Sequence, residues 1–198
     1  MPGIVLYGLH GAERWQAGRL RTLETPPGIY DLRLRLPGLV TSIAPDPAIW
    51  IEDKRLSLVV HTRLTAEPDR LLARLRAPVT EAADAAGLQV RSGREVLEIC
   101  IPGIDKGSAI RELISSETAA AFYAGDDTGD LPAIRELNAW SGRSGRPKLA
   151  VAVSPPGSPS GSPSGSGPLA GHADLTVPDP HSLILLLRQI IENAAADR

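Results

Sequence analysis

The pattern of predicted strands and helices changes near residue 103, and this change limits the folds that the chain can adopt. Between residues 46 and 101 the apolar pattern predicts two strands, a helix and two further strands. That order favours an antiparallel sheet with a helix packed against it. After residue 103 predicted strands alternate with helices, which is typical of a parallel sheet with crossover helices. The chain is therefore expected to contain two α/β parts of different topology.

Individual segments of the first part carry clear periodicities. In residues 55–61 an apolar set alternates with a more polar set, which predicts a half-buried antiparallel strand. Apolar residues recur at spacings of three and four within 67–86, which predicts a helix. We also expect a short helix within 31–43, broken by Pro37 and Gly38.

Composition excludes several classes of protein. The chain has 21 basic and 23 acidic residues and a net charge of -2, which argues against binding nucleic acid by neutralising phosphates. Its one cysteine, Cys100, excludes an internal disulfide and the usual zinc site with several cysteines. No apolar run approaches the ~20 residues of a membrane helix, and residues 1–15 lack the pattern of a signal peptide. We therefore expect a soluble cytoplasmic protein.

Glycine and proline are abundant, with 19 and 18 residues, and part of this excess is local. Residues 154–168 contain only Ser, Pro and Gly. Such a composition cannot bury apolar area, so we expect a flexible surface loop there. The residues that follow are too few to fold alone, so this tract is not interpreted as a domain linker.

An acidic loop follows a predicted buried strand at 119–124. Asp126 and Asp127 come directly after Gly125, and Asp130 precedes a predicted helix. Ligands of parallel sheets bind beyond the carboxyl ends of the strands, and paired carboxylates at such a place suit Mg²⁺. The alternative is that Asp130 only caps the helix and Asp127 is solvated. We favour the metal interpretation for the pair Asp126 and Asp127.

A second polar segment, Asp105-Lys106-Gly107-Ser108, lies just before another predicted helix. A lysine near a helix N-terminus opposes the helix dipole, so a separate reason for its presence is expected. Pairing of Lys106 with a phosphate group or with the acidic loop would supply that reason. The alternative is a solvated lysine.

Together these motifs resemble the third and fourth motifs of the haloacid-dehalogenase phosphatase superfamily: Asp-Lys-Gly, then about 20 residues later a strand followed by GDDTGD. The segments 51–63, 90–110 and 123–134 are similar to one branch, the trehalose-6-phosphate phosphatases. Residues 7–13 resemble that family's segment between its second motif and its cap. The resemblance runs over most of residues 4–138.

The resemblance implies an α/β fold with a partial Rossmann-like haloacid-dehalogenase core and an α/β cap, an antiparallel sheet plus helices. Residues 1–20 would be a core segment leading to the cap, 21–102 the cap, and 103–198 the C-terminal part of the core. The implied activity is Mg²⁺-dependent hydrolysis of trehalose 6-phosphate to trehalose and phosphate.

The resemblance also implies roles in the core. Lys106 matches the lysine that steadies the phosphate and the nucleophile, and Asp126 matches the Mg²⁺ ligand. Asp127 and Asp130 match the supporting acidic positions. We accordingly assign Lys106 and Asp130 as catalytic and Asp126 with Asp127 as metal ligands.

In the cap, Glu52, Lys54 and Glu98 match residues that bind the sugar hydroxyls. Charged hydrogen bonds to hydroxyls give orientation and specificity, so these side chains suit that task. Without the resemblance, Glu52 and Lys54 would be interpreted as a solvated turn pair and Glu98 as an outward residue of a strand. His10, His61 and Arg63 match family positions near the cap and hinge, for which a structural role is the alternative.

One motif of the family is missing. The family begins with Asp-x-Asp-Gly-Thr, which supplies the nucleophile and the general acid and base, and this sequence contains no Asp-x-Asp. In order of preference, the start is misassigned or the gene truncated, a separate N-terminal half completes the protein, or the chain is a non-catalytic sugar-phosphate binder. We expect a trehalose-phosphatase homologue that does not turn over alone. A phosphatase for another sugar phosphate is the remaining alternative.

Overall fold

A computed structural model of the chain describes residues 3–154 and 169–196 and divides it into two compact units. The first unit spans Met1–Ile104 and the second Asp105–Arg198. The tract at 154–168, for which a flexible loop is expected, lies outside the described residues except for Ser154. No helix of the described ranges is both long and apolar enough to cross a membrane.

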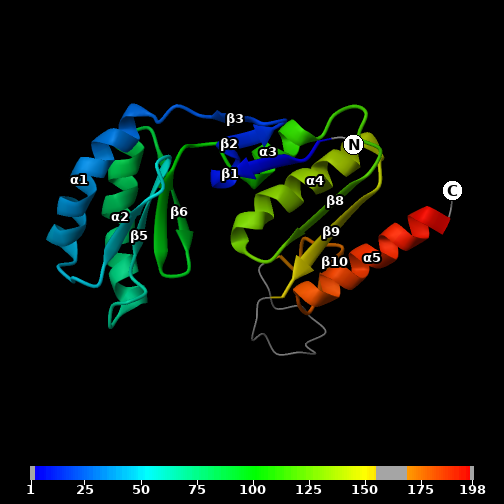
Figure 1. Ribbon diagram of the computed structural model, residues 1–198. Coiled ribbons are helices and arrows are strands. Elements are labelled where there is room, and N and C mark those ends of the chain that lie inside the picture. Colours follow the sequence, from blue (N-terminus) through cyan, green and yellow to red (C-terminus); the bar gives the residue numbers. More distant parts are fainter. Residues whose placement is uncertain (1–2, 155–168, 197–198) are drawn as a thin grey trace. The chain divides into compact units, whose positions relative to one another are not determined.

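The first unit begins with a small antiparallel sheet in the order β1-β2-β3 (Figure 1). Its strands are β1 (Val5–Gly8), β2 (Glu13–Gln16) and β3 (Arg19–Thr22). Leu6, Trp15 and Leu20 pair across the three strands and form an apolar row on one face, where each side chain is exposed.

The larger sheet of this unit has four antiparallel strands in the order β4-β5-β7-β6. Its strands are β4 (Trp50–Asp53), β5 (Ser57–His61), β6 (Gln89–Gly93) and β7 (Val96–Cys100). Two helices, α1 (Pro27–Ile43) and α2 (Pro68–Ala85), pack side by side against one face of it (Figure 1). These elements agree with the strand, strand, helix, strand, strand pattern predicted for residues 46–101.

The core of the first unit lies between the helices and this face of the sheet. It is built from a stripe on each helix and from alternate residues of β5 and β7, among them Leu36, Leu75, Leu58 and Ile99. Period two in the strands and a spacing of three to four in the helices place these side chains on facing surfaces. The opposite face of the sheet is therefore free to carry polar side chains.

The prediction of a broken helix at 31–43 is wrong. The structure has one continuous helix, α1, from Pro27 to Ile43, with Pro37 inside it. Ile29, Leu32, Leu36 and Val40 are buried along one face. Burial of four large side chains outweighs the loss of the one backbone hydrogen bond that Pro37 cannot donate.

Strand β5 is more deeply buried than its alternation indicates. Leu58 and Val60 face the helices as expected, but Ser57, Val59 and His61 on the other face are also buried. Part of this cover comes from Leu9, His10 and Ala12, which lie over the Ser57 end of the strand. The half-buried strand predicted at 55–61 is therefore buried on both faces.

The second unit contains a parallel sheet in the order β10-β9-β8. Its elements, in chain order, are α3 (Lys106–Leu113), β8 (Ala121–Gly125), a short 3-10 turn (Thr128–Asp130), α4 (Leu131–Ser144), β9 (Lys148–Val153), β10 (Leu175–Val177) and α5 (Pro180–Ala196). This alternation of strands and helices agrees with the predicted parallel sheet with crossover helices.

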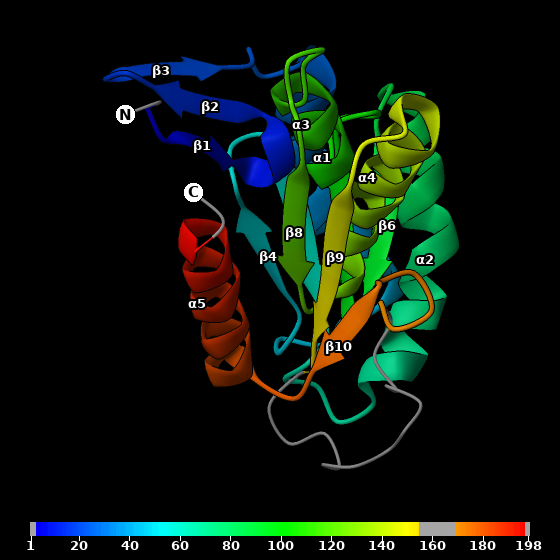
Figure 2. The same ribbon diagram turned by 90° about the vertical axis from the view of Figure 1, so that its right-hand side faces the viewer.

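The two faces of this parallel sheet differ. Helix α4 covers one face, where Ile134, Leu137 and Trp140 pack on Ala150 and Ala152. Helix α5 lies on the other side (Figures 1 and 2). On that side Phe122 and Leu175 are 39% and 41% exposed, and α5 exposes Ile184, Leu185 and Ile191.

Helix α3 approaches α4 closely at Gly107. A Cβ at this position would lie 2.7 Å from the carbonyl oxygen of Pro132. The carbonyl belongs to the backbone of α4, so it cannot move aside as the end of a flexible side chain could. Gly107 therefore permits the contact that brings the start of α3 to the start of α4.

We predict that Gly107→Ala destabilises the protein by about 1–3 kcal/mol, because the added methyl group overpacks the contact between α3 and α4. Gly142→Ala is the matched control, since nothing lies within 4 Å of a Cβ there. Removing a glycine from the interior of α4 should stabilise by roughly 0.5–1 kcal/mol. Urea unfolding measures both changes, and equal effects would contradict the close approach.

Candidate functional site

The start of α3 places Lys106 at the acidic loop. Asp105 is the N-cap of α3: its carboxylate accepts a hydrogen bond from the Ser108 amide at 2.8 Å, and its own amide donates to the Ser108 hydroxyl at 3.1 Å. Lys106 is the first residue of the helix, and its ammonium lies 2.5 Å from Asp130 Oδ1 and 4.0 Å from Asp127 Oδ1. The predicted pairing of Lys106 with the acidic loop is present.

Asp130 is the centre of this arrangement. Its Oδ1 accepts hydrogen bonds from the Lys106 ammonium and, at 2.6 Å, from the Tyr123 hydroxyl. Its Oδ2 lies 3.1 Å from the Asp126 amide and 3.3 Å from the Asp127 amide. Asp130 is the residue before α4, but its side chain makes no capping hydrogen bond to that helix. The alternative in which Asp130 only caps α4 is therefore wrong.

The ionisation of Asp130 and Tyr123 fits this geometry. Burial alone would raise the pKa of Asp130, but the hydrogen bonds from Lys106, Tyr123 and the Asp127 amide outweigh it and hold that pKa below its usual value. Burial, and then the hydrogen bond to Asp130, raise the pKa of the Tyr123 phenol well above its usual value. At neutral pH Asp130 is thus an ionised carboxylate, and Tyr123 keeps its proton and donates a hydrogen bond to it.

Gly125 allows the carboxylate of Asp130 to reach the loop backbone. A Cβ on Gly125 would lie only 2.4 Å from Cγ of Asp130. Any other residue at the end of β8 would therefore displace the carboxylate from the Asp126 and Asp127 amides. The glycine that ends the predicted strand is part of the site.

Asp126 and Asp127 are the residues of the loop that could hold a cation. Both are exposed, and one carboxylate oxygen from each of Asp126, Asp127 and Asp130 lies within 4.8 Å of the others. Within the described ranges the Asp126 carboxylate makes no hydrogen bond or ion pair. Mg²⁺ is commonly held by one or two carboxylates and several waters, so this pair fits the ion. Both oxygens of Asp130 already accept two hydrogen bonds each, which suits a supporting position rather than a ligand.

A second ionic contact joins α3 to α4. Glu136 on α4 lies 2.6 Å from Arg111 on α3 and 3.1 Å from Arg143. The hydrogen bond from Arg111 is the main cause that holds the pKa of Glu136 below its usual value; burial opposes it and the bond from Arg143 adds to it. Glu136 therefore helps to fix the helix that carries Lys106.

The predicted sugar-binding residues gather on the face of the four-stranded sheet that is turned away from α1 and α2. Glu52 on β4 and Glu98 on β7 both pair with Val59 of β5, and Arg91 on β6 pairs with Glu98. The two glutamates thus occupy one row, with a single strand between them. Strand spacing puts their backbones roughly 10 Å apart.

Lys54 and His61 lie beside Glu52. The Lys54 ammonium is 3.7 Å from Glu52 Oε2, and His61 Nε2 is 3.1 Å from the same oxygen. The Arg63 guanidinium lies 2.9 Å from His61 Nδ1. Arg63, the buried His61 and Glu52 therefore form one chain of polar contacts, which ends at the Glu52 carboxylate.

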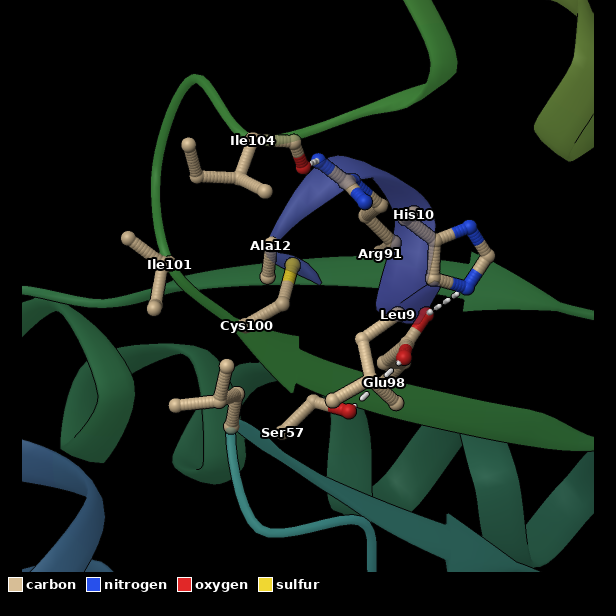
Figure 3. Close-up of a pocket in the computed structure, with 10 residues that line it drawn as sticks. Leu9, His10, Ala12, Ser57, Arg91, Glu98, Cys100, Ile101 and Ile104 are labelled. Atoms are coloured by element: carbon tan, nitrogen blue, oxygen red, sulfur yellow. Dashed lines mark hydrogen bonds and ion pairs between the residues drawn. The ribbon is translucent and has the colours of Figure 1, made fainter. Parts of the chain in front are cut away.

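Glu98 is less exposed than Glu52. Figure 3 shows its own partners, Ser57 and His10. The Ser57 hydroxyl donates to Glu98 Oε1 at 3.0 Å, and His10 Nε2 is 3.8 Å from Glu98 Oε2. His10 reaches this position from a turn in which Leu9 and His10 both have positive φ, at 47° and 58°. A left-handed conformation at two consecutive non-glycine residues is uncommon, so the surrounding contacts must hold it.

The sequence predicts the charged residues of one cluster in each unit, but not the side chains that hold them in place. Tyr123 was not singled out, although a tyrosine two residues before Gly-Asp-Asp on a small apolar strand is a usable signal. His61 was noted without a role. Its contact with Glu52 follows from the pairing of β4 with β5, and the register of that pairing cannot be derived from the sequence.

A model of the trehalose-phosphatase family matches residues 1–164 of the chain. A curated relative, a "trehalose-6-phosphate phosphatase-related protein" of Thermoplasma acidophilum, is 30% identical over 104 residues. That match covers 48% of this chain and 44% of the relative, so it spans less than half of the relative's length.

Solved structures are similar in fold. A crystal structure of a trehalose-6-phosphate phosphatase related protein has a TM-score of 0.63 and 22% identity, covering 96% of this chain and 72% of that one. The trehalose-6-phosphate phosphatase of Aspergillus fumigatus has a TM-score of 0.62 and 20% identity, covering 97% and 71%. These similarities confirm the predicted α/β fold.

We predict that Asp130→Asn destabilises the protein by about 2–4 kcal/mol, because an amide cannot accept from all four donors and leaves Lys106 without its carboxylate. Asp126→Asn is the matched control, since its carboxylate is exposed and should change stability by less than ~0.5 kcal/mol. Urea unfolding in metal-free buffer compares them. A loss of similar size in both variants would contradict the supporting role of Asp130.

The lowered pKa of Glu136 predicts that this residue contributes to the loss of folding stability in acid. A lowered pKa in the folded state means that Glu136 stabilises the protein above its unfolded pKa of ~4.3, and that this contribution is lost as the pH falls through the folded pKa. Glu136→Gln should therefore be less stable than the wild type at neutral pH, with the difference shrinking as the pH falls below the unfolded pKa and through the lowered folded pKa. Denaturation midpoints across the pH range measure this, and a constant difference would refute it.

Proposed function

This chain belongs to the trehalose-phosphatase family, and from that premise we propose that it binds trehalose 6-phosphate together with Mg²⁺. The observation that carries the proposal is the Lys106 ammonium, fixed 2.5 Å from Asp130 and 4.0 Å from Asp127 at the carboxyl end of β8. A cation held beside exposed carboxylates suits a site shared by a phosphate group and a metal ion.

Each residue of the acidic loop has a distinct task in this proposal. Lys106 pairs with the phosphate oxygens, while Asp126 and Asp127 hold Mg²⁺. When bound, the ion neutralises charge on the phosphate group and polarises it. Asp130 keeps Lys106 and the two loop amides in place through its four hydrogen bonds. This preorganisation spares the site a rearrangement when the ligand binds.

The cap face recognises the sugar. Glu52 and Glu98 accept hydrogen bonds from sugar hydroxyls, and Lys54 donates one. The row that Glu52 and Glu98 share across three strands supports this, because two acceptors with one strand between them can bind separated hydroxyls of one ligand. A ligand that lacks these hydroxyls is disfavoured, since it would cover a free carboxylate oxygen such as Glu52 Oε1 without supplying a hydrogen-bond donor.

In this family the nucleophile for hydrolysis comes from an Asp-x-Asp motif, and these 198 residues contain no Asp-x-Asp. We therefore propose that the chain as given binds the substrate without turning it over, and that turnover requires a polypeptide carrying that motif. The exposed apolar side chains Phe122 and Leu175, on the sheet face away from α4, support a further covering segment. A non-catalytic sugar-phosphate binder is the second candidate, supported by the intact row of Glu52 and Glu98.

We predict that the purified chain releases no phosphate from trehalose 6-phosphate with Mg²⁺ but gives heat of binding in calorimetry. Glu52→Ala should weaken that binding at least about tenfold, because it removes a charged acceptor for a hydroxyl. Glu81→Ala is the matched control, since Glu81 is an exposed glutamate on α2, on the other face of the sheet. Omitting Mg²⁺ should weaken binding in the wild type and have little effect in Asp126→Asn.

Two results would contradict this proposal. Absence of heat at millimolar trehalose 6-phosphate would remove the binding function. Phosphate release that Asp126→Ala abolishes would show that the chain contains another nucleophile. Equal binding of a different sugar phosphate would instead show that trehalose 6-phosphate is not the preferred ligand. Lys54 and Glu98 would then be the residues to substitute.

A further inference from the structure

His61 lies between two charged side chains and an aromatic ring. Its side chain is only 5% exposed, on the same sheet face as Glu52. Nε2 of the ring is 3.1 Å from Glu52 Oε2, and Nδ1 is 2.9 Å from the Arg63 guanidinium. Both ring nitrogens are therefore occupied by partners of opposite charge.

These partners fix the tautomer of the ring. A guanidinium can only donate, so Nδ1 must accept the hydrogen bond from Arg63 and cannot carry a proton. The single proton of the neutral ring is then on Nε2, where it is donated to the Glu52 carboxylate. Burial lowers the pKa of His61, and although the bond to Glu52 opposes this, the net direction is downward. The neutral ring at physiological pH agrees with the geometry.

The ring is also held in orientation. Trp50 stacks on it with ring centroids 3.8 Å apart and planes 1° from parallel. Trp50 and His61 are direct partners in the pairing of β4 with β5, so the sheet itself brings the two rings together. A stacked and buried ring has little rotational freedom, which is the property needed to hold a neighbouring carboxylate.

We propose that His61 is a positioning residue for Glu52: as the Nε2-protonated tautomer, it holds one carboxylate oxygen so that the other accepts from a ligand hydroxyl. The proposal rests on the proposed function of Glu52 in sugar recognition. The groups that face His61 are Glu52 and Lys54 from β4 and its turn, Arg63 beyond β5, and Trp50. Within the described ranges no hydrogen bond or ion pair engages Glu52 Oε1, whereas Oε2 faces both His61 and Lys54.

The first test reads the tautomer without any ligand. Nitrogen NMR of the ¹⁵N-histidine-labelled full chain at neutral pH should show His61 protonated on Nε2 alone. A proton on Nδ1, or on both nitrogens, would overturn the proposal. The carboxyl carbon shift of Glu52 should move in His61→Phe, which keeps the stacked ring but cannot donate, and return towards the wild-type value in His61→Gln, which restores an N–H donor.

The second test measures affinity for trehalose 6-phosphate with Mg²⁺. His61→Phe should weaken binding about tenfold and His61→Gln much less, which corresponds to losing and regaining one hydrogen bond to a charged group. A purely structural histidine would not be rescued by Gln. If Glu52→Ala loses binding while His61→Phe binds like the wild type, the positioning role is wrong.

Two outcomes separate this inference from the proposed function. If the wild type itself gives no heat, the proposed function fails, and the NMR measurements alone decide whether His61 holds Glu52. If His61→Phe does not fold, Arg63→Ala replaces it: Arg63 is exposed, and its loss removes the donor and the charge that keep a proton off Nδ1. Nε2 should stay protonated by its contact with Glu52, and the doubly protonated ring should appear at a higher pH than in the wild type. Loss of the proton from Nε2, or a protonation profile identical to the wild type, would overturn the proposal, with Arg70→Ala as the control on an exposed arginine of the same unit.

Discussion

The buried carboxylate of Asp130 is the interaction on which the second unit depends. It accepts from Lys106 at the start of α3, from Tyr123 in β8 and from two amides of the loop that carries Asp126 and Asp127. Four donors from three structural elements converge on one charged group, and each bond is stronger because that group is ionised and shielded from water. The sheet, the helix and the acidic loop are thus fixed together by one side chain.

In the first unit, the corresponding constraint is the rigidity of the polar face of the four-stranded sheet. Its two helices cover one side of the four-stranded sheet, and the alternation of the strands then directs Glu52, His61 and Glu98 to the other side. Each glutamate has a neutral neighbour that donates to one of its oxygens: His61 for Glu52 and Ser57 for Glu98. Acceptors held in this way lose little conformational entropy when a ligand binds.

The strands and helices with regular apolar spacing could be predicted from the sequence, as could the acidic loop and its lysine. The helix predicted at 67–86 is found at Pro68–Ala85. The hairpin of β2 and β3 was not predicted, because it has no buried face to give a periodic signal, and α1 passes through Pro37 because packing outweighs local propensity. The roles of Tyr123 and His61 depend on contacts between elements, which residue spacing does not encode.

The residues that donate hydrogen bonds to Asp130 lie close to it in the sequence. Its most distant partner, Lys106, is 24 residues away, and the others lie within seven. Closing loops of this size costs little entropy and is fast compared with assembling a sheet from remote strands. The acidic loop can therefore take its final conformation early in folding, before the remaining sheet contacts form.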